Sequence, residues 1–517
     1  MHRPASLTRL LSFAVIAACA LPCAAHAQAD TRLAEAAMNR DVAAVRALLA
    51  QKVDPNSPGR DGTPALHWAV RADDLELASL LVVAGADVRL SNRHGVTSLA
   101  VAAANGNPEM MRLLLDAGAD PNGVDQAGEP MLLIAARVGV ADAVRLLLDR
   151  GAIVDARDAT YQQTPLMVAV RENHLDVVRL LIERGADVNA KTRVGSTPAW
   201  VLPNSVPGFG HGVGIIRGGL PERGRRDPIP GGLSPLLYAA RDGRVEAARL
   251  LLDAGADIDQ TDPNGITPLI MAIVNNRVAV ARLLVERGAD IHRADWYGRT
   301  PLWSAVETRN MDVDNATFVN SIDREPLLEL IRILLDKGAD PNVRTKEVPP
   351  IRRAFLRVTG SLEWVDFTGM TPFLYAARAG DVTVMRLLLQ HGADPHIPTY
   401  AGTTALMAAA GINWVFDQTY DEGPERLLEA VKLCYDLGLD VNAVNSMGLT
   451  ALHGAANRGS DDIIRFLVEK GAKLDVADNE GRTPLTWAEG VFLATHPAKP
   501  KPSSIALIKS LLERSAP

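Results

Sequence analysis

The sequence predicts a mainly α-helical solenoid, in which about twelve short helix pairs stack one on the next. Glycines that open a Gly-Ala-Asp-like element recur along the chain, and several lie 33 residues apart, as Gly85 and Gly118 do. Hydrophobic residues make up 47% of the chain, but aromatic residues only 4%. A core built from Ala, Leu and Val suits thin layers of closely packed helices, so composition and period agree.

Each unit opens with a signal for the start of a helix. Thr-Pro-Leu occurs at residues 164–166, 267–269, 300–302 and 483–485. A threonine hydroxyl accepts a hydrogen bond from a free amide of the first turn, and proline loses no hydrogen bond at the first helical position. We therefore expect a helix to begin at each of these motifs.

The remainder of each unit fits a second helix and a turn. Small pairs such as Ala135-Ala136 let two helices approach closely, and apolar stripes such as residues 177–181 cover the other side. A glycine such as Gly185 then ends the second helix in a left-handed conformation. The segment Asp187-Val188-Asn189 that follows is typical of the turn into the next unit.

This unit resembles the ankyrin repeat, and the resemblance covers nearly all of the chain after residue 27. It implies an ankyrin-repeat solenoid of helix pairs with β-hairpin or loop fingers, from a cap at residues 30–56 to a last helix at residues 505–514. One unit cannot bury its own apolar face, so each depends on its neighbours. At roughly 10 Å per layer, we expect a curved rod on the order of 110 Å long.

The N-terminus predicts an export signal. Arg3 and Arg9 supply a positive start, residues 10–21 form an apolar stretch too short to span a bilayer, and Ala25-His26-Ala27 matches a cleavage site. The mature chain would begin at Gln28 and be periplasmic or secreted. Together with the Ala, Arg and Gly content, this signal favours an exported bacterial type of ankyrin-repeat protein.

Three cysteines bear on anchoring and on disulfides. Residues 16–19, Ile-Ala-Ala-Cys, also resemble a bacterial lipobox, which would anchor the chain by a lipid on Cys19. Cleavage after residue 27 would remove Cys19 and Cys23 and leave Cys434 alone, so no internal disulfide could form. Cys434 lies on an apolar helical stripe, which predicts a small buried side chain rather than a reactive thiol. No later run predicts a transmembrane segment.

The regular spacing is interrupted by insertions. A Pro/Gly-rich insertion at residues 203–232 divides the chain into a signal peptide (1–27), N-terminal repeats (28–202), the insertion and C-terminal repeats (233–517). Further insertions lie at residues 312–325, 345–364, 412–423 and 490–503. The resemblance places the insertions at 203 and 345 near the fingers, and the other three between the two helices of a unit. Long insertions are either functional or tolerated drift in surface loops, and both readings stay open.

The search for chemistry finds no nucleophile motif, no paired metal ligands and no carboxylate cluster, so we expect no enzyme, no metal and no cofactor. The glycines of residues 208–214 fit neither a Walker loop nor a dinucleotide fingerprint. His67 and His453 stand at the fourth position of the helix-start motif, where the resemblance implies hydrogen bonds between repeats. A net charge of -7 argues against a surface built for nucleic acid.

Arginines mark the first of two candidate binding stripes. The resemblance implies binding through the fingers and the ends of the inner, first helices. The first position after the Ala-Ala pair holds Arg71, Arg137, Arg171, Arg241 and Arg378. Stacking would align them as a broken cationic ribbon on the concave face, which favours an acidic protein partner. In the alternative, they pair with local acids such as Glu172 and Asp242 and form a neutralised, solvated face.

Aromatic residues mark the second stripe, on the fingers. Trp296, Phe367 and Tyr400 occupy one position in three successive units, and Tyr297 stands beside the first. Exposed aromatic residues often act as binding hot spots, worth about 2 kcal/mol or more each. In the alternative, the insertion at residues 345–364 covers them.

These observations predict a monomeric protein-protein interaction scaffold or adaptor that acts outside the cytoplasm and binds a protein partner on its concave face. One alternative is an accessory or immunity factor that neutralises a specific exported enzyme or toxin. A less favoured alternative is an enzyme with its site in the insertions, above all residues 203–232. An effector delivered into host cells fits poorly with a Sec-type signal.

Overall fold

The computed structural model describes residues 30–195, 230–310, 324–346, 365–414, 421–491 and 498–515. In these residues, 24 helices follow one another as twelve consecutive pairs, which confirms the predicted solenoid class. The chain divides into two compact units, Met1–Val101 and Ala102–Pro517. The predicted signal peptide, and most of the insertion at residues 203–232, lie outside the described residues.

The first unit contains two complete helix pairs, α1 (Arg32–Met38) with α2 (Val42–Ala50) and α3 (Ala65–Arg71) with α4 (Leu75–Val83). Helix α5 (Ser98–Asn105) spans the boundary between the units.

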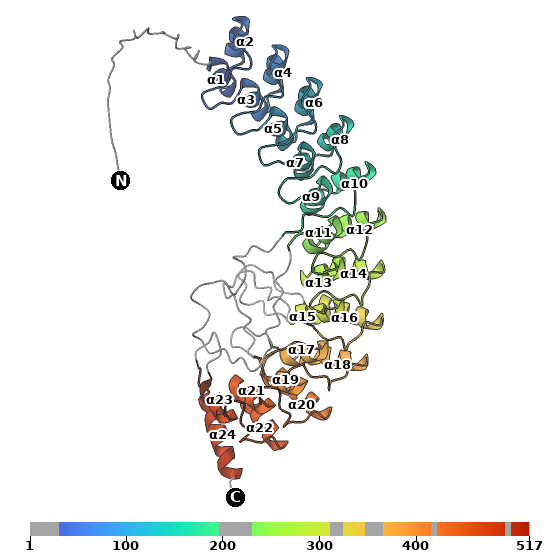
Figure 1. Ribbon diagram of the computed structural model, residues 1–517, viewed down its shortest axis with the longest axis vertical. Coiled ribbons are helices and arrows are strands. Elements are labelled where there is room, and N and C mark those ends of the chain that lie inside the picture. Colours follow the sequence, from blue (N-terminus) through green and yellow to red (C-terminus); the bar gives the residue numbers. More distant parts are fainter. Residues whose placement is uncertain are drawn as a thin grey trace, which may run out of the picture. The chain divides into compact units, whose positions relative to one another are not determined.

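The second unit contains the remaining helices, whose pairs follow one another in Figure 1. They are α6 (Pro108–Asp116), α7 (Met131–Val138), α8 (Ala141–Asp149), α9 (Pro165–Glu172), α10 (Leu175–Glu183), α11 (Pro235–Asp242), α12 (Val245–Asp253), α13 (Pro268–Val274), α14 (Val278–Glu286), α15 (Pro301–Arg309), α16 (Arg324–Asp336), α17 (Pro372–Ala379), α18 (Val382–Gln390), α19 (Ala405–Ala410), α20 (Pro424–Asp436), α21 (Ala451–Arg458), α22 (Asp461–Glu469), α23 (Pro484–Gly490) and α24 (Pro502–Ser515).

Two rows of helices run through the second unit. First helices contact first helices, as in the series α7, α9, α11 and α13, and second helices contact second helices, as in α8, α10, α12 and α14. Ala135 and Ala136 on α7 are fully buried, as are Val177, Val178 and Leu181 on α10. The core therefore consists of the small and aliphatic side chains that the composition predicted.

Threonine starts the first helices as expected. The hydroxyl of Thr267 accepts a hydrogen bond from the backbone N–H of Ile270 at 3.2 Å, and Pro268 is the first residue of α13. The hydroxyl of Thr300 accepts one from Trp303 at 3.3 Å, before α15. These side chains satisfy amide groups that the first turn of a helix leaves without a partner.

The fingers are tight turns stabilised by aspartate. Asp125 is typical: its Oδ1 accepts hydrogen bonds from the backbone N–H groups of Ala127 at 2.9 Å and Glu129 at 2.8 Å. Val124 and Pro130 form a single β-bridge across this turn. In the described part of the chain, bridged fingers carry such isolated bridges instead of extended hairpin strands.

Asparagine joins successive fingers, which sequence analysis did not predict. The Nδ2 of Asn122 donates to the carbonyl of Gly151 at 3.0 Å, and its Oδ1 accepts from the N–H of Ile153 at 2.8 Å. Asn442 forms the same pair of bonds with Gly471 and Lys473, both at 2.9 Å. One side chain thus satisfies both a carbonyl and an amide of the next repeat.

The helix bounds show which helices flank each predicted insertion. Residues 203–232 lie between α10 and α11 and residues 345–364 between α16 and α17, and the other three insertions separate the two helices of one pair. At the base of the first, the N–H of Gly195 donates to the carbonyl of Pro230 at 2.9 Å. Most residues of these insertions lie outside the described ranges. The last helix begins at Pro502, three residues before the predicted start.

Candidate protein-interaction face

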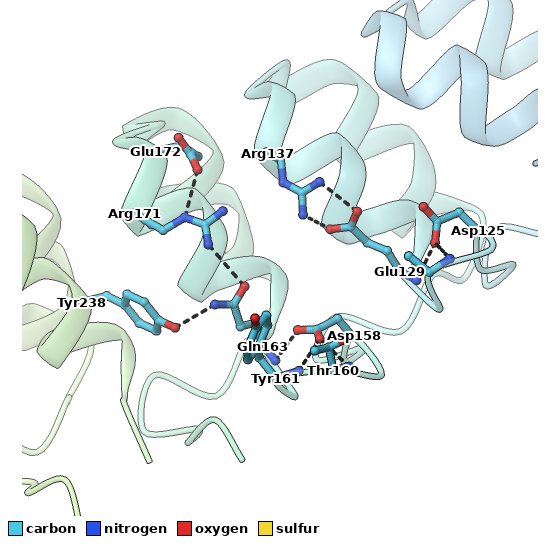
Figure 2. A network of polar contacts seen from close by, with 11 residues as sticks. Asp125, Glu129, Arg137, Asp158, Thr160, Tyr161, Gln163, Arg171, Glu172 and Tyr238 are labelled. Atoms are coloured by element: carbon cyan, nitrogen blue, oxygen red, sulfur yellow. Dashed lines mark hydrogen bonds and ion pairs between the residues drawn. The ribbon is translucent and has the colours of Figure 1, made fainter. Parts of the chain in front are cut away.

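The candidate face consists of the fingers and the C-terminal ends of the first helices. On α7, Arg137 forms two contacts with the carboxylate of Glu129 in the preceding finger, one of them an Nη1–Oε2 hydrogen bond of 2.8 Å (Figure 2). The finger turn holds Glu129 in turn, because Asp125 binds its backbone N–H. Arg137 is therefore exposed but fixed by a local acid.

Arg171 on α9 occupies the same position and joins a longer network (Figure 2). Its Nη1 donates to Oε1 of Gln163 at 3.4 Å, and its Nε donates to Glu172 at 2.9 Å. The Nε2 of Gln163 donates to the hydroxyl of Tyr238 on α11 at 2.7 Å, and burial raises the pKa of that phenol. The network connects one repeat with the next across the face.

These contacts share one spacing. The residue in the arginine position of the first helix pairs with the finger residue eight positions earlier in the sequence. The same spacing holds with the charges reversed in α15, where Glu307 accepts from Nη1 of Arg299 at 3.2 Å. Arg299 also donates to Asp295 at 2.8 Å and is buried. Sequence analysis missed this pair because it looked for arginine at the helix position alone.

Arg241 and Arg71 differ in their partners. Nε and Nη2 of Arg241 bind both oxygens of Asp242 at 2.8 and 2.9 Å, and these hydrogen bonds raise the pKa of the guanidinium. Arg71, in the first unit, is exposed and stacks on Trp68, with its Cζ 5.4 Å from the ring centroid. Among the described residues it forms no ion pair.

The pairing with Glu172 and Asp242 that one interpretation predicted is thus present, and Glu129 extends it to Arg137. Arg378 on α17 instead lies beside two aromatic rings, 5.4 Å from that of Phe367 and 5.9 Å from that of Tyr375. The stripe is therefore not a uniform cationic ribbon. Its role in binding stays a prediction.

The aromatic stripe is only partly exposed. Tyr297 and Phe367 each expose 2% of their surface, so the expectation of exposed rings is wrong for both. Each packs under an arginine of its own repeat, Tyr297 under Arg299 at 5.4 Å and Phe367 under Arg378. Trp296 is half-buried, and its backbone N–H donates to the carbonyl of Asn264 at 3.0 Å. These rings stabilise the fingers from within.

Two finger tyrosines remain open to solvent. Tyr400, which the stripe included, is 55% exposed, and Arg344 stacks 4.1 Å from its ring centroid. Tyr161, which sequence analysis missed, is 65% exposed at the finger shown in Figure 2. Tyr161 did not fit the predicted aromatic stripe, because its spacing from the following helix differs from that of Trp296, Phe367 and Tyr400.

The two motif histidines play the structural role that the resemblance implied. The Nε2 of His453 lies 3.2 Å from the carbonyl of Arg482 in the next repeat, and its Nδ1 accepts from the N–H of Thr450 at 3.0 Å. His67 bonds to the carbonyl of Val96 at 2.9 Å. Burial lowers the pKa of both, to about 4 for His453, so both rings are neutral near pH 7.

Other candidate chemistry is limited. Cys434 is buried, and burial raises the pKa of its thiol to about 12, as expected of a packing residue. No group of three or more His, Cys, Asp or Glu side chains in the described ranges could hold a metal ion. No helix in the described part of the chain is long and apolar enough to cross a membrane.

Comparisons with known proteins identify the family to which the repeats belong. A family model described as ankyrin repeats, in three copies, matches residues 33–125, 118–192, 220–295, 236–345, 322–416 and 424–490. In sequence, 188 residues are 27% identical to ankyrin repeat and SOCS box protein 3 of Bos taurus, covering 33% of each chain. Another 171 residues are 29% identical to alpha-latrocrustotoxin-Lt1a of Latrodectus tredecimguttatus, covering 33% of this chain and 10% of the toxin.

A solved structure, the ankyrin repeat domain of Bcl-3, is 28% identical, with a TM-score of 0.37 over 47% of this chain and 94% of that chain. The chain spans a third or less of the length of the curated relatives named here.

Proposed function

The chain belongs to the ankyrin-repeat family, and from this premise we propose that it is a protein-protein interaction scaffold that acts outside the cytoplasm and holds an acidic partner on the face described above. The observation that carries the proposal is an exposed finger tyrosine stacked on an arginine that the carbonyls of Gly369 and Pro398 hold in place. The pair is Tyr400 with Arg344. Tyrosine and arginine are enriched at interfaces, and side chains fixed before binding lose little entropy.

Electrostatics supports an acidic partner. Arg71 and Arg378 have no carboxylate partner among the described residues, and Arg137 stays exposed beside Glu129. A partner that brings carboxylates to this face would complete these pairs. Because the contacts would be charge-assisted, capture should weaken as salt rises.

The test of the face is charge reversal. Purified full-length chain is used as bait in a periplasmic extract, and captured protein is identified and quantified by mass spectrometry. In the variant, Arg71, Arg137 and Arg171 are each replaced by Glu. We expect capture to be lost with no change in the thermal unfolding midpoint, because all three arginines lie at the surface or near it.

A matched control comes from the second helices. Arg145, Arg179 and Arg249 are similarly exposed, at 50%, 51% and 45%, and each pairs with an acid three residues earlier. Replacing these three by Glu should leave capture intact. Equal capture by both triple variants would exclude the first-helix face as the binding surface.

Export is the second part of the proposal, and it rests on residues 1–27. Expression of the full chain in a Gram-negative host, followed by cell fractionation and N-terminal sequencing, tests it. We expect mature protein outside the cytoplasm with Gln28 as its first residue. A lipidated N-terminus at Cys19 would favour the lipobox instead, and an uncleaved cytoplasmic chain would contradict export.

A further inference from the structure

A gap in the arginine stripe lies at α19. The position that holds arginine in α17 holds Gly411 in α19, and a Cβ there would come within 2.6 Å of the carbonyl oxygen of Gly454 on α21. The same Cβ would lie 3.3 Å from the Cβ of Arg458. Glycine thus permits α21 to approach α19 closely, and the Arg458 side chain reaches back toward α19. Its Nη1 donates to the carbonyl of Ala409 at 3.2 Å.

Arg458 is buried with most of its donors unused. Its exposed fraction is 9%, and its Nε and Nη2 have no hydrogen-bond partner. The Nε of Arg378, on the other side of α19, has none either. Burial, with a smaller contribution from the positive charge of Arg378, lowers the pKa of Arg458 to about 10, although the charge of Asp421 opposes the shift. A buried guanidinium with unused hydrogen-bond donors is unfavourable, so the arrangement is incomplete as it stands.

Nε and Nη2 form one edge of the guanidinium, the edge that binds both oxygens of a carboxylate. This protein uses that edge elsewhere: Arg241 binds Asp242 through the same two atoms at 2.8 and 2.9 Å. In Arg241 the edge is occupied, and in Arg458 it is buried without a hydrogen-bond partner. The free edge therefore fits a carboxylate in shape as well as in charge.

The surroundings of Arg458 carry excess positive charge. Its Cζ lies 5.4 Å from the ring centroid of Trp414, and the Nζ of Lys501 lies 5.6 Å from the same centroid. The carboxylate that acts on Arg458 is Asp421, which accepts a hydrogen bond from Nε1 of Trp414 at 3.2 Å. Among the described residues, Asp421 alone offsets the charge of Arg458, and Arg378 opposes it.

Two further acids among the described residues, Asp381 and Glu422, are already engaged. Asp381 binds Arg309 at 2.9 Å, and Glu422 binds Arg324 at 3.1 Å. These carboxylates are held by their own arginines, so they do not supply the anion that Arg458 lacks.

We propose that Arg378 and Arg458 form a clamp, on either side of α19 and against Trp414, for a carboxylate of an acidic peptide segment of the partner. The inference rests on the proposed function, since it names the chemistry by which that face recognises its partner. The partner's Asp or Glu side chain would take both free donors of Arg458, and the charge of Arg378 would add to the attraction.

The test uses the full chain and a fluorescein-labelled hexaglutamate peptide, with binding followed by fluorescence anisotropy at low salt. Arg458→Met and Arg378→Met should each weaken binding by about tenfold or more, because a hydrogen-bonded charge is lost. Arg458→Met should unfold at the same temperature or higher, because it removes an unpaired buried charge. Arg179→Met is the control, because Arg179 lies on the second helix α10 and already pairs with Asp176; its peptide affinity should not change.

Three results would overturn the clamp. The first is wild-type affinity for hexaglutamate no greater than for hexaserine, and the second is unchanged affinity in Arg458→Met. The third is displacement of the peptide by inorganic phosphate far below the concentration at which acetate displaces it, which would assign the site to a phosphate group. Should Arg458→Met fold poorly, Arg458→Lys replaces it, since lysine keeps the charge but loses the two-pronged edge and should also weaken binding.

The two proposals can fail separately. Peptide binding that depends on Arg458, without capture of any partner from extract, would retain the clamp and reject the proposed function. Capture that depends on Arg71, Arg137 and Arg171 would retain the proposed function. If Arg458→Met then affected neither capture nor peptide binding, the clamp would be rejected.

Discussion

At the scale of the residue, one position decides how successive fingers are joined. Asn122 both donates to and accepts from the backbone of the next repeat. Asp259 occupies the equivalent place and accepts from the N–H of Asp290 at 3.0 Å, but a carboxylate has no donor for a carbonyl. Burial raises the pKa of Asp259, and the charges of Asp290 and Asp257 add to the effect. An ionised aspartate is thus a poor substitute for asparagine at this position of the finger.

We therefore predict that Asp259→Asn stabilises the protein. The amide supplies the missing donor and removes a repelled charge, so the free energy of unfolding at pH 7 should rise by about 1 kcal/mol. Urea denaturation measures it. The reverse change, Asn122→Asp, serves as the control and should cost a similar amount. A loss of stability in Asp259→Asn would show that the position tolerates the carboxylate.

The stability gained in Asp259→Asn should depend on pH, because the pKa of Asp259 is raised in the folded protein. The folded pKa of Asp259 lies above the ordinary value of 3.8, so the contribution of Asp259 to stability is complete below that value and is lost as pH rises through the folded pKa. At neutral pH the carboxylate is at its greatest disadvantage against asparagine. The advantage of Asp259→Asn should be full at pH 7 and shrink as pH falls toward 3.8.

At the scale of the element, a buried ion pair connects helices of adjacent repeats. Nε of Arg309, the last residue of α15, donates to Oδ2 of Asp381 at 2.9 Å, and both side chains are buried. Asp381 also caps α18, because its Oδ1 accepts from the N–H of Val384 at 3.1 Å. Arg309 additionally contacts the carbonyl of Arg324 at the start of α16. Three helices meet at this pair.

Arg309→Met should therefore destabilise the protein by about 3–5 kcal/mol, since it leaves Asp381 buried without its partner. Chemical denaturation gives the value. The control is Arg145→Met, which breaks an exposed pair with Asp142 and should cost less than about 1 kcal/mol. Adding Asp381→Asn to Arg309→Met should recover part of the loss. Equal, small effects of Arg309→Met and Arg145→Met would refute this role.

At the scale of the whole molecule, the second unit behaves as a one-dimensional stack. Its helix contacts join each pair to the pair before and the pair after, as α21 with α23 and α22 with α24. Stability in such an array is a sum of terms between neighbours. The effect of removing an end should therefore fade along the chain.

Ending the chain after residue 482 removes α23 and α24, including the buried Trp487 and Ile508. We expect amide hydrogen exchange to become faster in α21 and α22, whose covered faces are opened, and to stay unchanged in α7 to α10. Mass spectrometry of exchanged peptides measures both regions in one experiment. A uniform increase throughout the second unit would mean that it unfolds as a single block.

The candidate face shows which features can be predicted from the sequence and which cannot. Thr300 at a helix start and Gly411 at a break in the stripe can be read from the sequence, because their effects are local. Whether Tyr297 is buried and Tyr400 exposed depends on which arginine packs over each ring and from which side. The contact of Arg458 with α19 spans 49 residues, so no local pattern indicates it.

The helix pairs, their order and their approximate number can be predicted from the amino-acid pattern alone, because each repeat uses the same short-range signals for starting and ending a helix. The folded arrangement is needed to show which arginines are neutralised, which aromatic rings are covered and which guanidinium keeps unused donors. Those outcomes depend on side chains from different repeats meeting in space, where burial and the count of available partners fix the energy of a charge.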